Sequence, residues 1–171
     1  MNDNTFNKQK HNLEYHAVLS FIAEYNRTRK RHIHFICQCE PPMPDTLCRL
    51  GDKQIGVEVA HTYGTGEEAA TRLGNLDMKD FPDKVHRGRR IIPISIRALR
   101  SLNDILAKKA NAKYQFSPTW LLVRNGFFHF SLTDYCKSKG EILVPHGHPF
   151  EKIWLLCDER SIGPKGMMRL H

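Results

Sequence analysis

The chain has 171 residues, of which 40% are hydrophobic and 26% are charged, a composition that suits one globular domain and excludes a disordered or coiled-coil protein. No apolar run approaches the ~20 residues of a membrane helix, and residues 1–12 are polar and lack the apolar stretch of a secretory signal, so we expect a cytoplasmic protein with no membrane partner. The net charge of +8 favours a polyanionic partner.

The positive charge is concentrated in one part of the sequence. Residues 84–113 hold nine basic residues and one acidic residue, whereas the rest of the chain has as many acidic as basic residues. The nine are Lys84, Arg87, Arg89, Arg90, Arg97, Arg100, Lys108, Lys109 and Lys113. Such a segment on a neutral body is typical of a phosphate-binding surface, and a solvated charged surface is the alternative. We expect Arg87, Arg89, Arg90 and Lys113 to contact a nucleic-acid backbone.

The first half of the chain predicts a helix followed by strands. Apolar residues at three- and four-residue spacing indicate an amphipathic helix over residues 13–29, and alternation indicates a strand over 32–39. Residues 45–62 are typical of a β-hairpin that turns at Gly51 and Asp52. The Gly-rich stretch 63–83 predicts no more than a short helix near residues 67–73.

The second half predicts a long helix over residues 94–114, which begins after Pro93. Strands are expected at 120–124, 127–130 and 152–157, with a short helix at 132–139. This order indicates an α/β fold with a mixed central β-sheet flanked by helices. We expect a flexible N-terminus at residues 1–12, one domain at 13–157 and a loose tail at 158–171.

Two carboxylates stand out in the hairpin. Asp45 follows Pro44 at the start of the first strand, and Glu58 lies between two valines of the second strand. Carboxylates on adjacent strands can share one sheet edge and form a hard-oxygen site for Mg²⁺ or Mn²⁺, which the Val59 carbonyl can complete. For Asp45, the alternative to a metal ligand is a simple turn residue. Glu58 lies in an otherwise apolar strand, where a carboxylate needs a partner.

The segment PDTLCRLGDKQIGVEVA, with its Pro-Asp and its Ile-Gly-Val-Glu-Val, resembles the PD-(D/E)XK nuclease superfamily. The match lies at Pro44, Asp45 and Glu58, and the chain departs from the pattern at Ala60, where the family has a lysine. Some members without that lysine supply one from the following helix, which makes Lys109 the expected substitute because it continues the Leu102 and Leu106 face. Lys113 is expected one turn later on the same face.

The resemblance implies a restriction-endonuclease-like core and metal-dependent hydrolysis of nucleic acid, with DNA expected rather than RNA. Asp45, Glu58 and the Val59 carbonyl would hold Mg²⁺ or Mn²⁺, and Lys109 would orient the attacking water or share the phosphate charge. Glu14 resembles the helix glutamate of some members, and a solvated acid at a helix start is its alternative role. The resemblance also admits a homodimer, because many members cut two strands with two subunits.

Two other interpretations remain open at this stage. Ala60 is compatible with a nuclease fold that has lost catalysis and serves as a nucleic-acid-binding or protein-interaction module. A zinc-stabilised binding protein is the other, because His and Cys side chains are frequent zinc ligands. The residues in question are His32, His34, Cys37, Cys39, His146 and His148. The cysteines Cys48, Cys136 and Cys157 are expected in the interior as small apolar residues.

Overall fold

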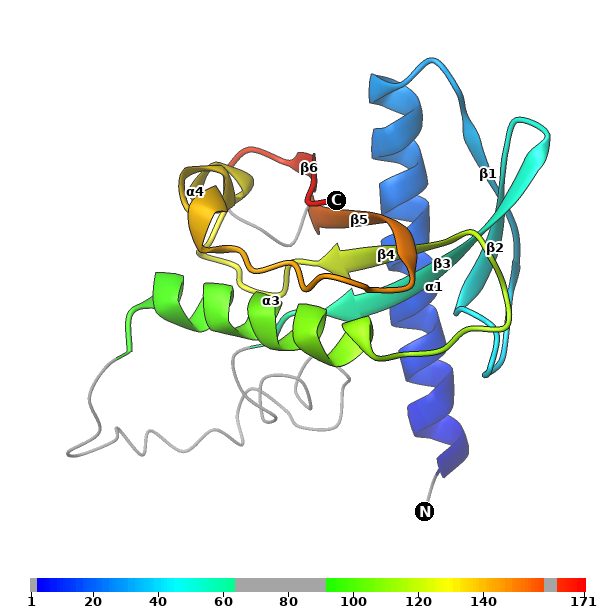
Figure 1. Ribbon diagram of the computed structural model, residues 1–171, viewed down its shortest axis with the longest axis horizontal. Coiled ribbons are helices and arrows are strands. Elements are labelled where there is room, and N and C mark those ends of the chain that lie inside the picture. The colour runs from blue at the N-terminus through cyan, green and yellow to red at the C-terminus, as the bar shows by residue number, and fades with distance from the viewer. Residues whose placement is uncertain (1–2, 64–91, 159–162) are drawn as a thin grey trace.

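The computed structural model describes residues 3–63, 92–158 and 163–171, which form a mixed α/β fold with one six-stranded sheet (Figure 1). Its helices are α1 (Asp3–Thr28), α3 (Ile94–Ala110) and α4 (Leu132–Lys137), and a 3₁₀ turn, η2 (Lys139–Glu141), follows α4. Its strands are β1 (Ile33–Gln38), β2 (Thr46–Leu50), β3 (Lys53–His61), β4 (Thr119–Arg124), β5 (Phe150–Cys157) and β6 (Gly166–Arg169). The predicted α/β class with a mixed sheet flanked by helices is therefore confirmed.

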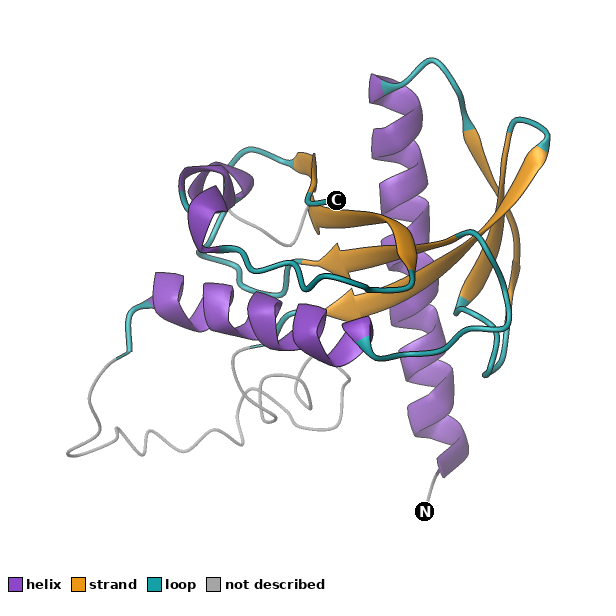
Figure 2. Ribbon diagram, in the orientation of Figure 1, coloured by secondary structure: helices purple, strands orange, loops and turns teal. Residues whose placement is uncertain are grey.

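The strands lie in sequence order across the sheet, from β1 at one edge to β6 at the other (Figure 2). Strands β1, β2 and β3 form an antiparallel meander, β3, β4 and β5 are parallel, and β6 runs antiparallel to β5. Each parallel step needs a long crossover, and α3 lies within the one between β3 and β4.

The two long helices cover opposite faces of the sheet, and α1 crosses the strands while α3 lies along them (Figure 1). Helix α1 buries Val18 and Phe21 against the face of the sheet that carries Trp120. Helix α3 buries Leu102 against the face that carries Leu121. Because successive residues of a strand point to opposite faces, a strand covered on both sides is apolar throughout, which explains the TWLLVR sequence of β4.

The β2–β3 hairpin has the predicted turn. Gly51 has a φ of 61° at the first central position of the two-residue turn, as in a type II′ turn, and L residues with side chains avoid that region. The pairing begins at Leu50 with Lys53 and ends at Thr46 with Val57. Strand β3 continues to His61, so β2 covers only its first half.

Helix α1 begins at Asp3, whereas the apolar spacing predicted a start at Leu13. Its first residues extend beyond the part that packs on the sheet, so they carry no apolar stripe from which a helix could be predicted. At the other end of the chain, the expected loose tail contains β6, which pairs Met168 with Leu155.

The predicted strand at residues 127–130 is wrong. The Asn125 side chain accepts from the Phe127 N–H and donates to the Phe127 and Phe130 carbonyls, at 3.0, 3.0 and 2.7 Å. These bonds pair the backbone N–H and C=O groups with a nearby side chain, so the segment forms a turn and not a β-strand. Phe127 and Phe130 are buried in the core beneath α3, which explains the apolar pattern.

Candidate active site

Asp45 and Glu58 meet where β2 stops covering β3. The pairing of Thr46 with Val57 sets Asp45 one position before the ladder and Glu58 one position beyond it. The Val59 N–H donates to Asp45 Oδ2 at 2.8 Å. The Asp45 side chain thus provides a hydrogen-bond acceptor for a backbone N–H of β3 that β2 does not pair with. The carboxylate is thereby fixed against the strand that carries Glu58.

A glycine makes room for this approach. A Cβ at Gly56 would lie 2.4 Å from Pro44 Cγ, so any larger residue would push Pro44 away. Gly56 precedes Glu58 by two positions on the same face of β3. The Pro-Asp and Gly-Val-Glu segments therefore fit together because of Gly56.

Lys109 supplies the cation beside Glu58. Glu58 is only 7% exposed, and Lys109 Nζ donates to its Oε1 at 2.5 Å from the last turn of α3. The apolar face of α3 packs on the sheet through Leu102 and Leu106, and Lys109 follows on that face. A buried carboxylate requires such a partner, since an unpaired charge in the interior is strongly destabilising.

Helix α1 adds a third carboxylate from the opposite face. Glu14 is 5% exposed and pairs with Lys10 at 3.3 Å, one turn earlier. Glu14 interacts electrostatically with both Asp45 and Glu58. The alternative of a solvated acid is therefore wrong for Glu14, and three carboxylates share this region with the ammonium groups of Lys10 and Lys109.

The crowding of carboxylates changes their protonation. Burial, together with the negative charges of Glu58 and Glu14, raises the pKa of Asp45 to about 7. Burial also raises the pKa of Glu14, although Lys10 opposes that shift. The cluster thus carries more negative charge than its lysines neutralise, which favours a proton or a cation at this point.

Tyr114 lies at the margin of the cluster, four residues after α3 ends. Its buried hydroxyl faces Glu58 but forms no hydrogen bond of acceptable geometry within the part of the chain that the structure describes. Burial and the Glu58 charge raise the pKa of Tyr114, which keeps the phenol protonated. It is a donor directed at the carboxylate region.

The residues present fit a hard divalent cation. Asp45 Oδ1 and Glu58 Oε2 take no part in the bonds to Val59 and Lys109, and Mg²⁺ sites typically use one or two carboxylates plus waters and phosphate oxygens. No group of three His, Cys, Asp or Glu side chains arranged to hold a metal occurs in residues 3–63, 92–158 and 163–171. Any ion here would depend on Asp45, Glu58, the Val59 carbonyl and non-protein oxygens.

A cavity of about 310 Å³ adjoins the cluster. It lies beside the second half of β3 and is lined by both long helices. Its lining residues are Lys10, Leu13, Glu14, Val59, Ala60, His61, Tyr63, Ile105, Lys108 and Lys109. Ala60, which stands where the PD-(D/E)XK pattern has a lysine, belongs to the core under α3 and borders this cavity.

The predicted nucleic-acid contacts are only partly placed. Arg87, Arg89 and Arg90 lie outside the described residues, as does the helix expected near residues 67–73. Lys113 is exposed, but it does not continue the Lys109 face of α3 as predicted, because the helix ends at Ala110 and the Asn111 N–H caps the Lys109 carbonyl. The predicted positions of Asp45, Glu58, Lys109 and Glu14, in contrast, come together.

The zinc interpretation gains no support from the described part of the chain, because its His and Cys side chains form no three-ligand group. A β-bulge between Phe35 and Cys37 interrupts the regular alternation of β1, which the sequence did not indicate. Of the cysteines expected inside, Cys48 and Cys157 are buried, whereas Cys136 is exposed on α4.

Sequence reasoning missed Lys10 and Tyr114. Lys10 lies within the N-terminus that the sequence predicts to be flexible, although its spacing of four from Glu14 is the signal for a helical ion pair. Tyr114 had no comparable signal, because its approach to Glu58 depends on where the chain turns after α3.

Across the described ranges, no helix is both long and apolar enough to cross a membrane. Comparisons of the chain with protein-family models, curated proteins and solved structures return no match. The function of the chain is therefore inferred from the residues and the geometry of the carboxylate cluster.

Proposed function

We propose that this chain is a metal-dependent nuclease with a restriction-endonuclease-like core that hydrolyses phosphodiester bonds, in DNA rather than RNA. The observation that carries the proposal is the contact between Lys109 Nζ and Glu58 Oε1 at 2.5 Å. It supplies a lysine at the carboxylate pair although the motif position is Ala60. The site then has two carboxylates and a lysine, the residue types of the PD-(D/E)XK pattern that the chain resembles, and the lysine can stabilise charge that develops on a phosphate.

Each residue has a separate role in this proposal. Asp45, Glu58 and the Val59 carbonyl hold Mg²⁺ or Mn²⁺, which when bound stabilises the charge on the phosphate and makes a coordinated water more acidic. Lys109 orients the attacking water and shares the phosphate charge. Glu14 adds a third carboxylate on the α1 side, and its 3.3 Å pair with Lys10 opposes the rise in its pKa that burial causes.

The surroundings favour a polyanionic substrate. Lys10 and Lys108 are exposed where they border the 310 Å³ cavity, and exposed Lys113 lies beyond the end of α3. Lys10 and Lys108 border the cavity beside the carboxylates, where they would contact backbone phosphates, and the proposal assigns the same contact to Lys113. The proposal extends this surface to Arg87, Arg89 and Arg90, and it includes a cytoplasmic location and a homodimer.

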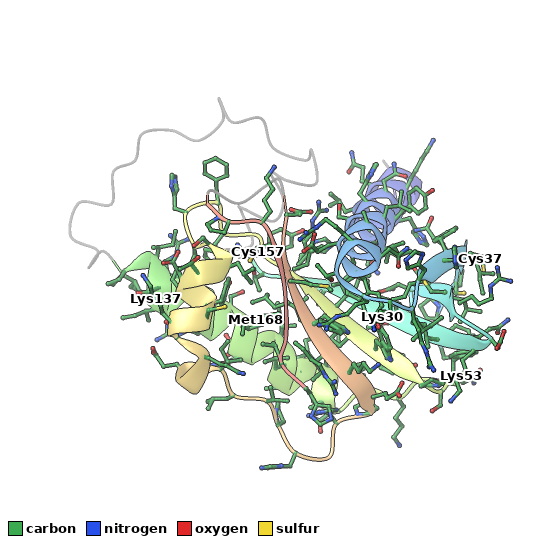
Figure 3. All side chains as sticks on the ribbon, turned by 90° about the horizontal axis from the view of Figure 1, so that it is seen from above. Lys30, Cys37, Lys53, Lys137, Cys157 and Met168 are labelled. Carbon is green, nitrogen blue, oxygen red and sulfur yellow. The ribbon has the colours of Figure 1, made fainter. Side chains whose placement is uncertain are left out.

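The test is a cleavage assay with supercoiled, linear duplex and single-stranded DNA and with RNA, each in Mg²⁺ and in Mn²⁺. Asp45→Asn and Glu58→Gln should abolish cleavage while keeping side-chain shape. Lys137→Ala, which removes an exposed lysine from the last turn of α4, is the matched control, and Figure 3 shows Lys137 at the end of the molecule opposite Cys37. Absence of cleavage under all conditions, or equal cleavage by the carboxylate variants, would contradict the proposal.

A second candidate follows from Ala60, because loss of the motif lysine also suits a nuclease fold that only binds nucleic acid or a protein partner. The two candidates separate in a crystal soaked with Mn²⁺. The nuclease requires an ion between Asp45 and Glu58, whereas a pure binding module leaves that position without one.

A further inference from the structure

Two thiols lie close together at the outer edge of the sheet, away from the carboxylate cluster. Cys37 belongs to β1 and Cys39 lies just beyond its end, and their Sγ atoms are 3.9 Å apart. Both are free thiols, Cys37 exposed and Cys39 partly exposed. Figure 3 shows Cys37 at the rim of the molecule, at the opposite end from Lys137 of α4.

Local structure explains the proximity. Residues two apart on an extended chain point to the same side, so the thiols of a Cys-Gln-Cys sequence face each other. A β-bulge between Phe35 and Cys37 shifts the register of β1, so that Cys37 pairs with Leu47. A disulfide has an S–S length of about 2.05 Å, so the two Sγ atoms must approach each other by roughly 2 Å to form it.

Cys39 is the residue that can move. Cys37 is held in the ladder by its pairing with Leu47, and the next residue, Gln38, donates its Nε2 to the His11 carbonyl of α1 at 2.8 Å. Cys39 lies outside the strand, and its backbone N–H donates to the Asp45 carbonyl at 3.0 Å. The Cys39 backbone thus connects the thiol pair to Asp45, whose side chain accepts from the Val59 N–H.

We propose that Cys37 and Cys39 form a dithiol that peroxides oxidise to an intrachain disulfide, and that this bond displaces Asp45 from Val59. The link between Asp45 and enzymatic activity rests on the proposed function, whereas the dithiol and the displacement do not. The reagent class is a hydroperoxide, and a small dithiol reverses the reaction by thiol–disulfide exchange.

The chemistry proceeds in two balanced steps. The exposed Cys37 thiolate attacks one peroxide oxygen, the O–O bond breaks, and Cys37 sulfenic acid and hydroxide form. The Cys39 thiol then attacks the sulfenic sulfur, the S–S bond forms, and the sulfenic oxygen leaves as water. Overall, two thiols lose two electrons and two protons, and one hydrogen peroxide becomes two waters. Burial raises the pKa of Cys39, which makes the more exposed Cys37 the first to react.

The first test treats the full chain with hydrogen peroxide, unfolds it, alkylates the remaining thiols and digests it with trypsin. Residues 32–49, which lie between arginines, carry Cys37, Cys39 and Cys48 in one peptide. We expect that peptide to lose two hydrogen atoms while Cys48 is alkylated, and a reductant to restore the mass. Cys136→Ser, which removes another exposed thiol, should give the same result, and Cys37→Ser should give no disulfide. Oxidation of Cys37 beyond the sulfenic acid without a bond to Cys39 would overturn the dithiol.

The second test follows the Val59 amide by hydrogen exchange in two-dimensional NMR. Peroxide should accelerate exchange at Val59 in the wild type and leave it unchanged in Cys37→Ser. A disulfide that forms while Val59 exchange stays the same would overturn the coupling to Asp45. Neither measurement uses nuclease activity, so failure of the proposed function would leave both results interpretable.

Discussion

Lys109 and Glu58 are 51 positions apart in the sequence, yet the Lys109 ammonium donates to the Glu58 carboxylate at 2.5 Å. Glu58 and Ala60 share the face of β3 that lies under α3, and Ala60 belongs to the apolar core there. Ala60 also borders the cavity beside the carboxylates, but its methyl group supplies no charge there. The helix that covers this face supplies the cation instead, which reconciles an Ala at the motif position with a lysine in the site.

Lys109→Met tests whether Lys109 takes the role of the lysine that the PD-(D/E)XK pattern has at position 60. The variant keeps the aliphatic stem but removes the charge, so under the proposed function cleavage should fall by about 100-fold or more, as when one preorganised stabilising group is lost. Lys137→Met removes an exposed lysine from α4 and should cut at the wild-type rate. Circular dichroism must show both variants folded, and wild-type cleavage by Lys109→Met would mean that α3 supplies no catalytic lysine.

The protonation of Asp45 should appear in the pH dependence of stability. Its folded-state pKa is about 7, well above the ordinary value of 3.8 for an aspartate, because of burial and the charges of Glu58 and Glu14. Between these values the folded protein binds the proton and the unfolded chain does not, so the unfolding free energy of metal-free protein should fall as pH rises from about 4 to about 7.

Asp45→Asn provides the comparison, because the amide cannot titrate. Both proteins are unfolded with urea in the presence of a chelator. As pH rises from about 4 to about 7, the unfolding free energy of the wild type should fall relative to that of Asp45→Asn, and above about pH 7 the difference should stay constant. A difference that is flat between pH 4 and 7 would show that Asp45 is not the titrating group.

A divalent cation should offset the repulsion among the carboxylates of Asp45, Glu58 and Glu14. Ligands that bind only the folded state raise stability by about 2.7 kcal/mol at a concentration 100 times their Kd. We therefore expect Mn²⁺ to raise the melting temperature of the wild type at pH 7.5 and to have little effect on Asp45→Asn or Glu58→Gln. An equal shift in all three proteins would place the ion elsewhere.

The sequence predicted the part of the site that depends on neighbouring strands. The register of a two-residue hairpin follows from its turn, so Asp45 and Glu58 were expected at one edge, and the apolar face of α3 indicated Lys109. The extent of α3 was less predictable. Polar residues after Ala110 allow either a further turn or a stop, and the stop removes Lys113 from the predicted face while Tyr114 approaches Glu58.

Other failures have one physical cause, which is that a local pattern does not reveal tertiary contacts. The aromatic run at residues 127–130 is typical of a strand, but the Asn125 side chain holds Phe127 and Phe130 in a turn. The start of α1 carries no apolar stripe, because that end of the helix does not pack on the sheet. Lys10 was missed for this reason.

Gly56→Ala tests whether the fit of Pro44 against β3 positions the carboxylates. The new Cβ would lie 2.4 Å from Pro44 Cγ and 3.1 Å from Thr119 Oγ1, so Pro44 and the adjoining Asp45 must shift. Overpacking of this kind lowers the unfolding free energy by about 1–3 kcal/mol, and Mn²⁺-dependent stabilisation should weaken as well. Gly140→Ala is the matched control, because its Cβ meets no atom within 4 Å and its stability should stay within about 0.5 kcal/mol of the wild type. If denaturant unfolding gave both alanine variants the same stability, Pro44 would not depend on Gly56 for its position, and the hairpin register alone would set the distance between Asp45 and Glu58.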